Sequence, residues 1–132
     1  MSEKKIIPIK RRYDTVILPW IDPHLLPNAA RRIHWASRAK IAAQARMIAR
    51  SCANEQKLVI PLAGIDLEME IKFHPPTARH YDIDGLLSAL KPSIDGLFEI
   101  SQADDHQVKR VILEIGDRLA AGVIRIRITP LE

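Results

Sequence analysis

The clearest pattern of hydrophobic and polar positions lies in residues 65–73, IDLEMEIKF, where apolar and charged residues alternate without a break. Alternation with a period of two predicts a β-strand with one buried and one exposed face. The acids in this pattern, at positions 66, 68 and 70, are expected to be solubilising surface. Four other stretches rich in β-branched residues also predict strands: residues 13–20, 57–62, 108–116 and 121–130.

Turn residues predict how these strands connect. Ala63-Gly64 favours a tight hairpin between residues 57–62 and 65–73, and GDRLAAG favours a second hairpin between the last two strands. Because strands cluster in hairpins instead of alternating with helices, the fold class is α+β. We expect a small, mainly antiparallel or mixed sheet of about five strands with two main helices packed on one face.

The first helix is predicted over residues 29–53. Three isoleucines, at positions 33, 41 and 48, fall on one side at helical spacing, and Asn28 is a plausible N-cap. The opposite side gathers arginines, which fits either a solvated face or a face that binds phosphate. These arginines are Arg31, Arg38, Arg46 and Arg50.

The second helix is predicted from leucines and isoleucines at helical spacing between Leu86 and Leu97. Pro92 lies inside it and either kinks the helix or begins a second short one, because proline has no backbone N–H to donate.

Length and charge limit the class of protein. The chain has 132 residues, of which 47% are hydrophobic, so we expect one domain over 1–132, with residues 1–12 as a flexible N-terminal arm. Twenty Lys and Arg against sixteen Asp and Glu give a formal charge of +4, which favours anionic partners. Cys52 is the only cysteine, and no apolar run approaches the roughly 20 residues of a membrane helix. These features predict a cytoplasmic protein with no membrane partner.

Acidic residues concentrate between Tyr81 and Val108, in Asp82/Asp84, Asp95 and Asp104/Asp105. In an extended segment, Asp82 and Asp84 point to the same side, where their charges about 4 Å apart repel by roughly 1 to 4 kcal/mol. A divalent cation removes this repulsion, and carboxylate oxygens without supporting Cys or His suit Mg²⁺ or Mn²⁺. The structural alternative is that Asp84 caps the second helix and Asp82 favours its dipole.

Basic residues accompany this acidic segment. Lys91 follows Asp84 by seven residues and precedes Asp95 by four, so these side chains can share a helix face. A lysine there would neutralise charge on a phosphate, although a plain Lys91–Asp95 surface ion pair explains the spacing equally well. Arg79 and His80 directly precede the acidic pair and are candidates to bind neighbouring phosphates.

The string DID-G-LLSALKPSIDGL…DDHQV resembles the core of the RusA family of Holliday-junction resolvases, and TVILPWIDPHLLPN is similar to that family's opening. The resemblance runs from about Thr15 to the end. It implies a RusA-like fold in which Asp82, Asp84 and Asp105 are the catalytic, metal-binding carboxylates. Gly85 and Ser88 stand where the family has asparagine and lysine, which makes Lys91 the candidate for the missing lysine.

The resemblance also implies an activity: a homodimer that binds four-way DNA junctions and makes paired nicks across the crossover with Mg²⁺ or Mn²⁺. Because aromatic residues are few, we expect recognition through shape and phosphates more than through bases. Two other functions remain open, a nucleic-acid-binding protein of the same fold without catalysis and a metal-dependent phosphohydrolase of nucleotides. The predicted DNA-binding residues are Arg31, Arg38, Arg46, Arg79 and His80.

Overall fold

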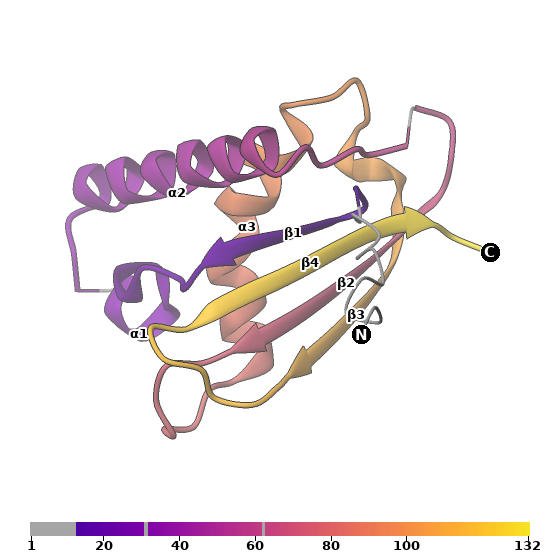
Figure 1. Ribbon diagram of the computed structural model, residues 1–132. Coiled ribbons are helices and arrows are strands. Elements are labelled where there is room, and N and C mark those ends of the chain that lie inside the picture. The colour runs from indigo at the N-terminus through magenta and orange to yellow at the C-terminus, as the bar shows by residue number, and fades with distance from the viewer. Residues whose placement is uncertain (1–12, 31, 62) are drawn as a thin grey trace.

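A four-stranded mixed sheet forms one layer of the protein and helices form the other (Figure 1). The computed structural model describes residues 13–30, 32–61 and 63–132, so the expected N-terminal arm and Arg31 lie outside the described residues. The strand order is β1-β4-β2-β3, in which β4 is antiparallel to β1 and β2 whereas β3 is parallel to β2. The α+β class is confirmed. The strands are β1 (Thr15–Pro19), β2 (Leu67–His74), β3 (Val108–Ile115) and β4 (Val123–Pro130).

The alternation predicted in β2 is confirmed. Leu67, Met69, Ile71 and Phe73 are buried on the face that the helices cover, while the charged residues between them lie on the opposite face. Ile65, predicted to point inward, precedes the strand and is 43% exposed. The core is completed by the inward residues of β1 and β4 and by the apolar faces of the helices: Val16, Leu18, Ile124, Ile126, Ile128, Leu86, Leu90, Ile94 and Leu97.

The predicted fifth strand and its hairpin are wrong. Residues 57–61 form no strand, although Leu58 and Ile60 are buried and the Val59 N–H donates to the Tyr13 carbonyl at 2.7 Å. The edge that such a strand would pair with is already occupied. The Gln56 side-chain amide donates to the Ile17 carbonyl at 2.7 Å and accepts from the Ile17 N–H at 2.8 Å, as a neighbouring strand would.

The second predicted hairpin is also wrong, since β3 and β4 are not paired with each other. Strand β4 lies between β1 and β2, and β3 lies at the far edge. The physical reason is visible in burial. The inward residues of β4 are Ile124, Ile126 and Ile128, all fully buried, whereas most of β3 is exposed. The strand with the more regular apolar face therefore takes the central position.

Helix α2 spans Trp35–Glu55 and begins later than predicted, after a short α1 (Pro27–Ala30). Its N-cap is His34, whose Nδ1 accepts from the Ala36 N–H at 3.2 Å, so the prediction of an Asn28 cap is wrong. Ala49 and Ala53 are the buried residues of α2, and Ile48, predicted to be on the buried side, is 48% exposed. Small residues instead of isoleucines therefore form the main contact of this helix.

Helix α3 spans Ile83–Phe98 and continues through Pro92 as one element, which decides between the two predicted alternatives. Its N-cap is Asp82, not Asp84. Helices α2 and α3 cross closely at Gly96, where a Cβ would fall far inside contact distance of the Arg46 carbonyl oxygen. The two remaining short elements are 3-10 turns, η2 (Pro23–Leu25) and η3 (Asp105–Gln107).

Candidate metal and nucleic-acid site

A cavity of about 500 Å³ lies at the beginning of α3, between its first turn, the α1 segment and the loop that precedes α3. Its walls combine acidic and basic side chains. The acidic members are Asp82 and Asp84, and the basic members are Arg32, Arg79 and His80. Of the residues predicted from sequence, the structure therefore brings together the acidic pair and the two basic residues that directly precede it.

The loop that leads into α3 is anchored to the core by Tyr81. The Tyr81 ring packs edge-on against Trp20 at 5.4 Å between centroids, and Trp20 packs in the same way on Phe73 at 6.2 Å. The Tyr81 hydroxyl and the Thr77 hydroxyl lie 3.1 Å apart, and the Arg79 guanidinium lies 4.9 Å from the Tyr81 ring centroid. These contacts fix the direction in which the loop enters the cavity.

Both carboxylates of the pair are exposed and lack a charged partner. Asp82 accepts a bond from the Leu86 N–H through its carbonyl at 3.0 Å, and its side chain makes no capping bond. The Asp84 carboxylate accepts only from the neighbouring Gly85 N–H, at 2.9 Å. Within the described ranges, neither Asp82 nor Asp84 forms an ion pair, so their oxygens are available to a ligand. The helix N-terminus favours their negative charge by about 0.3 to 1 kcal/mol each.

Asp105 belongs to a different group. The Lys91 ammonium donates to Asp95 Oδ1 at 2.5 Å and to Asp105 Oδ2 at 3.1 Å. The hydrogen bond to Asp95, and then the one to Asp105, raises the pKa of Lys91 above its ordinary value. Lys91 lies about 10 Å further along the α3 axis than Asp84, and its side chain reaches toward the carboxyl end of the helix, where Asp95 lies one turn on.

The η3 turn holds the second acidic pair through its own hydrogen bonds. The Asp104 N–H donates to the Gln107 side chain at 2.7 Å, and the Asp104 carboxylate accepts from the His106 N–H at 3.0 Å. The bond from the His106 backbone, followed by a side-chain bond to Asp105, lowers the pKa of Asp104. The buried Gln107 also donates to the Ile65 carbonyl at 2.8 Å, which ties the turn to the start of β2.

The structure does not bring the three expected metal ligands together. Across the part of the chain that the structure describes, one group of three acidic or histidine side chains has ligand atoms all within 4.8 Å of each other, and it is Asp104, Asp105 and His106. Asp82 and Asp84 are not part of it. Acidic residues that are adjacent in sequence and exposed commonly cluster in this way, so the group by itself indicates no ion.

The predicted basic track along α2 is divided by the structure. Arg46 and Arg50 lie near Glu99 at 3.4 and 3.7 Å, at the opposite end of α3 from the cavity. Arg38 lines a second groove between α2 and α3. Sequence reasoning missed Arg32 in the cavity wall and Trp35 in that groove. One signal was present: no Asp or Glu occurs between Asp22 and Glu55.

Comparison with known proteins gives a relative but no activity. No protein-family model matches the chain. An uncharacterised protein of Xylella fastidiosa (strain Temecula1 / ATCC 700964) is 34% identical over 118 residues, which cover 86% of this chain and 75% of that protein. The chain belongs to the same family as this protein. Among the described residues, no helix has both the length and the apolar character needed to span a membrane.

Proposed function

We propose that the protein is a Mg²⁺-dependent, structure-selective endonuclease that resolves four-way DNA junctions by paired cleavage of phosphodiester bonds. The observation that carries this proposal is the cavity at the start of α3, where two carboxylates without an ion-pair partner share walls with Arg32, Arg79 and His80. The choice of a four-way junction as substrate comes from the RusA-like sequence motifs. A cytoplasmic location remains a prediction from the sequence.

The donor set of the cavity fits the proposed cation. Two carboxylates, with no cysteine in the cavity wall, suit Mg²⁺, and Mn²⁺ is a chemically similar substitute. When bound, such an ion supplies Lewis-acid activation of the scissile phosphate. Asp82 and Asp84 would hold the ion, whereas Arg32 and Arg79 would bind and orient the phosphates on either side of it.

Lys91 and Asp105 take a different role in this proposal from the one that the resemblance implies. Asp105 is bound to the Lys91 ammonium, which also binds Asp95, so one cation holds both carboxylates and the trio keeps a net negative charge. We assign it to holding η3 against α3. The ammonium is too far along the helix to neutralise charge on a phosphate at Asp84.

A homodimer is part of the proposed function, because a two-fold protein matches a two-fold junction and places one site on each of two opposed strands. Strand β3 is the favoured interface. It is an edge strand with three exposed apolar residues, Val111, Ile112 and Ile115, whereas the other edge strand is covered by Gln56. Exposed apolar edges are templates for pairing with another chain.

One alternative is supported by particular observations. A protein of the same fold that binds branched DNA without cutting it would tolerate the separation of Asp105 from Asp82 and Asp84. It would also tolerate Gly85 and Ser88 at the family's asparagine and lysine positions. Catalysis by the RusA-like set of three carboxylates would need Asp105 beside the other two, but binding needs only the basic walls of the cavity.

The test compares wild type with Asp84→Asn and Asp105→Asn on a four-way junction, a duplex and a nucleotide, in Mg²⁺ and in Mn²⁺. We expect wild type to cut the junction. Asp84→Asn should cut about 100-fold or more slowly while binding the junction equally well, because a lost ligand removes several kcal/mol of transition-state stabilisation. Asp105→Asn should retain most of the cutting. Asp66→Asn, at an exposed position outside both acidic groups, is the matched control.

Three results would contradict the proposal. If wild type binds the junction but cuts nothing with either ion, the protein is the non-catalytic binder. If it hydrolyses the nucleotide without preferring the junction, it is a nucleotide phosphohydrolase. If Asp105→Asn loses as much cutting as Asp84→Asn, the active form brings these two carboxylates together and the assignment of separate roles is wrong.

A further inference from the structure

Trp35, the first residue of α2, is the most exposed large apolar side chain in the described ranges, at 69%. Exposure of a whole indole to water is unfavourable, since burial of an aromatic side chain is worth about 1.5 to 3 kcal/mol. Among the described residues, its one ring contact is with His34, at 5.6 Å between centroids and 32° between planes. One face of the indole is therefore open for a flat partner.

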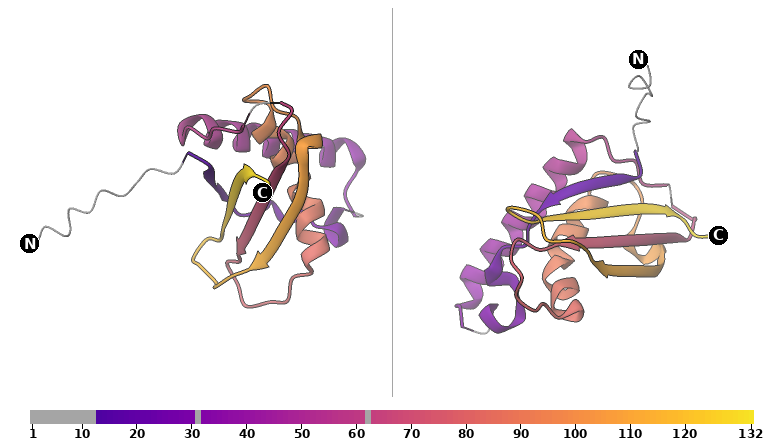
Figure 2. Two further views of the ribbon diagram at one scale, coloured as in Figure 1. Left: turned by 90° about the vertical axis from the view of Figure 1, so that its right-hand side faces the viewer. Right: turned by 60° about the horizontal axis from the view of Figure 1, so that its bottom comes forward.

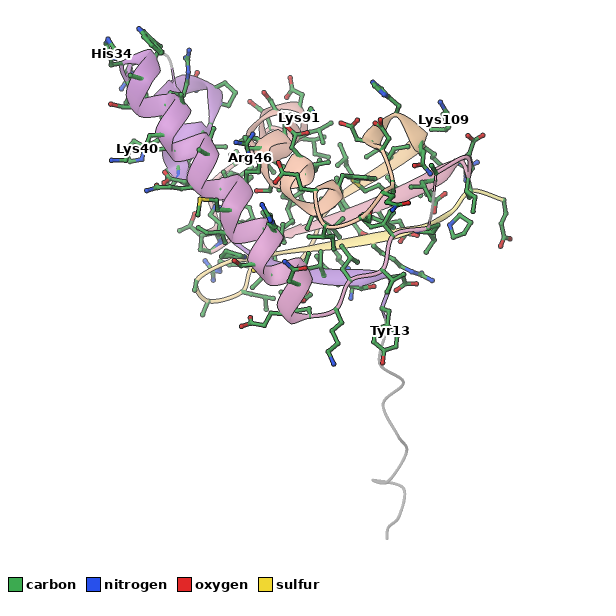
Figure 3. All side chains as sticks on the ribbon, turned by 90° about the horizontal axis from the view of Figure 1, so that it is seen from above. Tyr13, His34, Lys40, Arg46, Lys91 and Lys109 are labelled. Atoms are coloured by element: carbon green, nitrogen blue, oxygen red, sulfur yellow. The ribbon has the colours of Figure 1, made fainter. Side chains whose placement is uncertain are left out.

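The helix around Trp35 projects from the body of the protein. Residues 35–40 are exposed at every position, so no side of this helix end packs on the core. Figure 2 shows this end of α2 beyond the sheet, and in Figure 3 the side chains of His34 and Lys40 point away from the rest of the protein. A helix end of this kind is stabilised by what binds it more than by its own packing.

The charge of this surface selects the partner. Trp35 is surrounded along the chain by Arg32, His34, Arg38 and Lys40, and no acid occurs between Asp22 and Glu55. A protein surface would cover Trp35 with apolar groups and would need acids for these cations. An aromatic ring among positive charges instead fits a nucleic acid, in which bases stack on the ring and phosphates meet the cations.

The location connects Trp35 to the cavity of the acidic pair. Trp35 and Arg38 line a groove of about 500 Å³ between α2 and α3, together with Ser88 and Pro92. Pro27 lines both this groove and the acidic cavity, so the two are neighbours on one surface. A strand whose phosphate lies at Asp84 can continue along the groove toward the indole.

We propose that Trp35 is a base-stacking residue that binds an unpaired base next to the branch point of DNA. This inference rests on the proposed function, because it places the branch at the acidic cavity. It also changes the sequence-based expectation that bases contribute little to recognition. Any base suffices, because every base has a π-face that stacks on an indole.

The experiment follows Trp35 by ¹⁹F NMR in protein that carries 5-fluorotryptophan, while anisotropy of a labelled four-way junction reports binding independently. The chain has two tryptophans, and Trp20, half-buried against Phe73 and Tyr81, serves as the internal reference. We expect the Trp35 signal to shift and broaden on binding much more than the Trp20 signal. A fully paired duplex should give a smaller shift.

Variants supply a second measurement. Trp35→Ala should weaken junction binding by about 5- to 150-fold, and Trp35→Phe should restore most of it. Met47→Ala is the matched control, because Met47 is 66% exposed on the same helix but lines neither the groove nor the cavity. All three variants should melt within a degree or two of wild type.

The outcomes separate the two proposals. Junction binding without any change at Trp35, or equal affinity for Trp35→Ala and wild type, overturns the stacking role and leaves the proposed function intact. No binding of junction by wild type overturns both. A Trp35 signal that depends on protein concentration without DNA shows that a second copy covers the indole, which also overturns the stacking role.

Discussion

At the residue scale, the position of Lys91 in the sequence allowed two interpretations, and the structure supports one of them. The spacing to Asp95 predicted either a surface ion pair or a catalytic cation, and the structure contains the ion pair, extended to Asp105. The sequence indicated the acidic pair and its basic neighbours correctly as one group, because they are adjacent along the chain. The position of Asp105 depends on the length of α3 and its following loop, which residue types alone do not specify.

Lys91→Met should reveal the ion pair through the pH dependence of stability. The raised pKa of Lys91 means that its charged form is favoured in the folded state, so the contribution is complete below the unfolded value of 10.5. It is lost as pH rises through the higher folded value. Because the side chain is 59% exposed, we expect the variant to be less stable by at most about 1 kcal/mol at pH 7.

Urea denaturation of both proteins at pH 7 and at several values above 10.5 measures this difference. The gap between wild type and Lys91→Met should narrow at high pH. Lys109→Met is the control, since Lys109 is exposed and no ion pair of it occurs among the described residues. A gap that stays constant with pH would show that the methylene chain of Lys91, and not its charge, is responsible.

At the element scale, the crossing of α2 and α3 decides where the site lies. The two helices approach closely at Gly96 and Arg46, and the opposite end of α3 borders the cavity beside α1 and the loop at Tyr81. Helical periodicity identified both helices but not this crossing. It failed at the start of α2 because a short helix begins at Pro27 and the long one begins only after the His34 cap, and periodicity does not resolve two helix starts so close together.

Two glycines of α3 provide a matched test of the crossing. Gly96→Ala should destabilise the protein by about 1 to 3 kcal/mol or more, because the new methyl group would overlap the backbone of α2 at Arg46. Gly85→Ala should be neutral or stabilising by up to about 1 kcal/mol, since its nearest neighbour, Pro27, would be 3.5 Å away and alanine favours helix. Urea midpoints of both variants measure this. Equal midpoints would mean that the helices do not approach at Gly96.

At the scale of the whole molecule, the proposed dimer has a specific register. A two-fold axis normal to a sheet keeps every side chain on its own face, so two β3 strands must pair around a single residue. With Ile112 on the axis, each Arg110 lies opposite the Glu114 of the other copy, and Val111 lies opposite Leu113. With Val111 on the axis, Arg110 would instead face Ile112. Charge complementarity therefore selects Ile112.

Cysteine cross-linking tests this register. In a Cys52→Ala background, Ile112→Cys should form disulfide-linked dimers under mild oxidation, because residues on the axis are opposite each other at about 4.5 to 5.5 Å between Cα atoms. Val111→Cys is the control and should not cross-link, since its two copies are offset along the strands. Cross-linking of neither variant, or of both equally, would contradict the paired β3 interface. Non-reducing electrophoresis gives the readout.

Strand order is the part of the fold that the sequence specified least. All four strands of the structure were predicted from their residues, and the fifth predicted strand, at 57–62, is wrong. Neither predicted hairpin exists. Strands that follow each other in sequence usually pair, so β4 was expected beside β3. It lies instead between β1 and β2. The deciding difference, three fully buried isoleucines in β4 against an exposed β3, is a property of the assembled core.

The Gln56 amide on the outer side of β1 limits what the sheet can build. Pro19 has no N–H and the Val59 N–H binds the Tyr13 carbonyl on the same side, so among the described residues few groups of that side are left to pair with another strand. If two molecules join through β3, the continuous sheet of the dimer has a β1 strand at each of its two outer edges. Further molecules cannot readily extend this sheet, so concentrated solutions should contain dimers and no filaments.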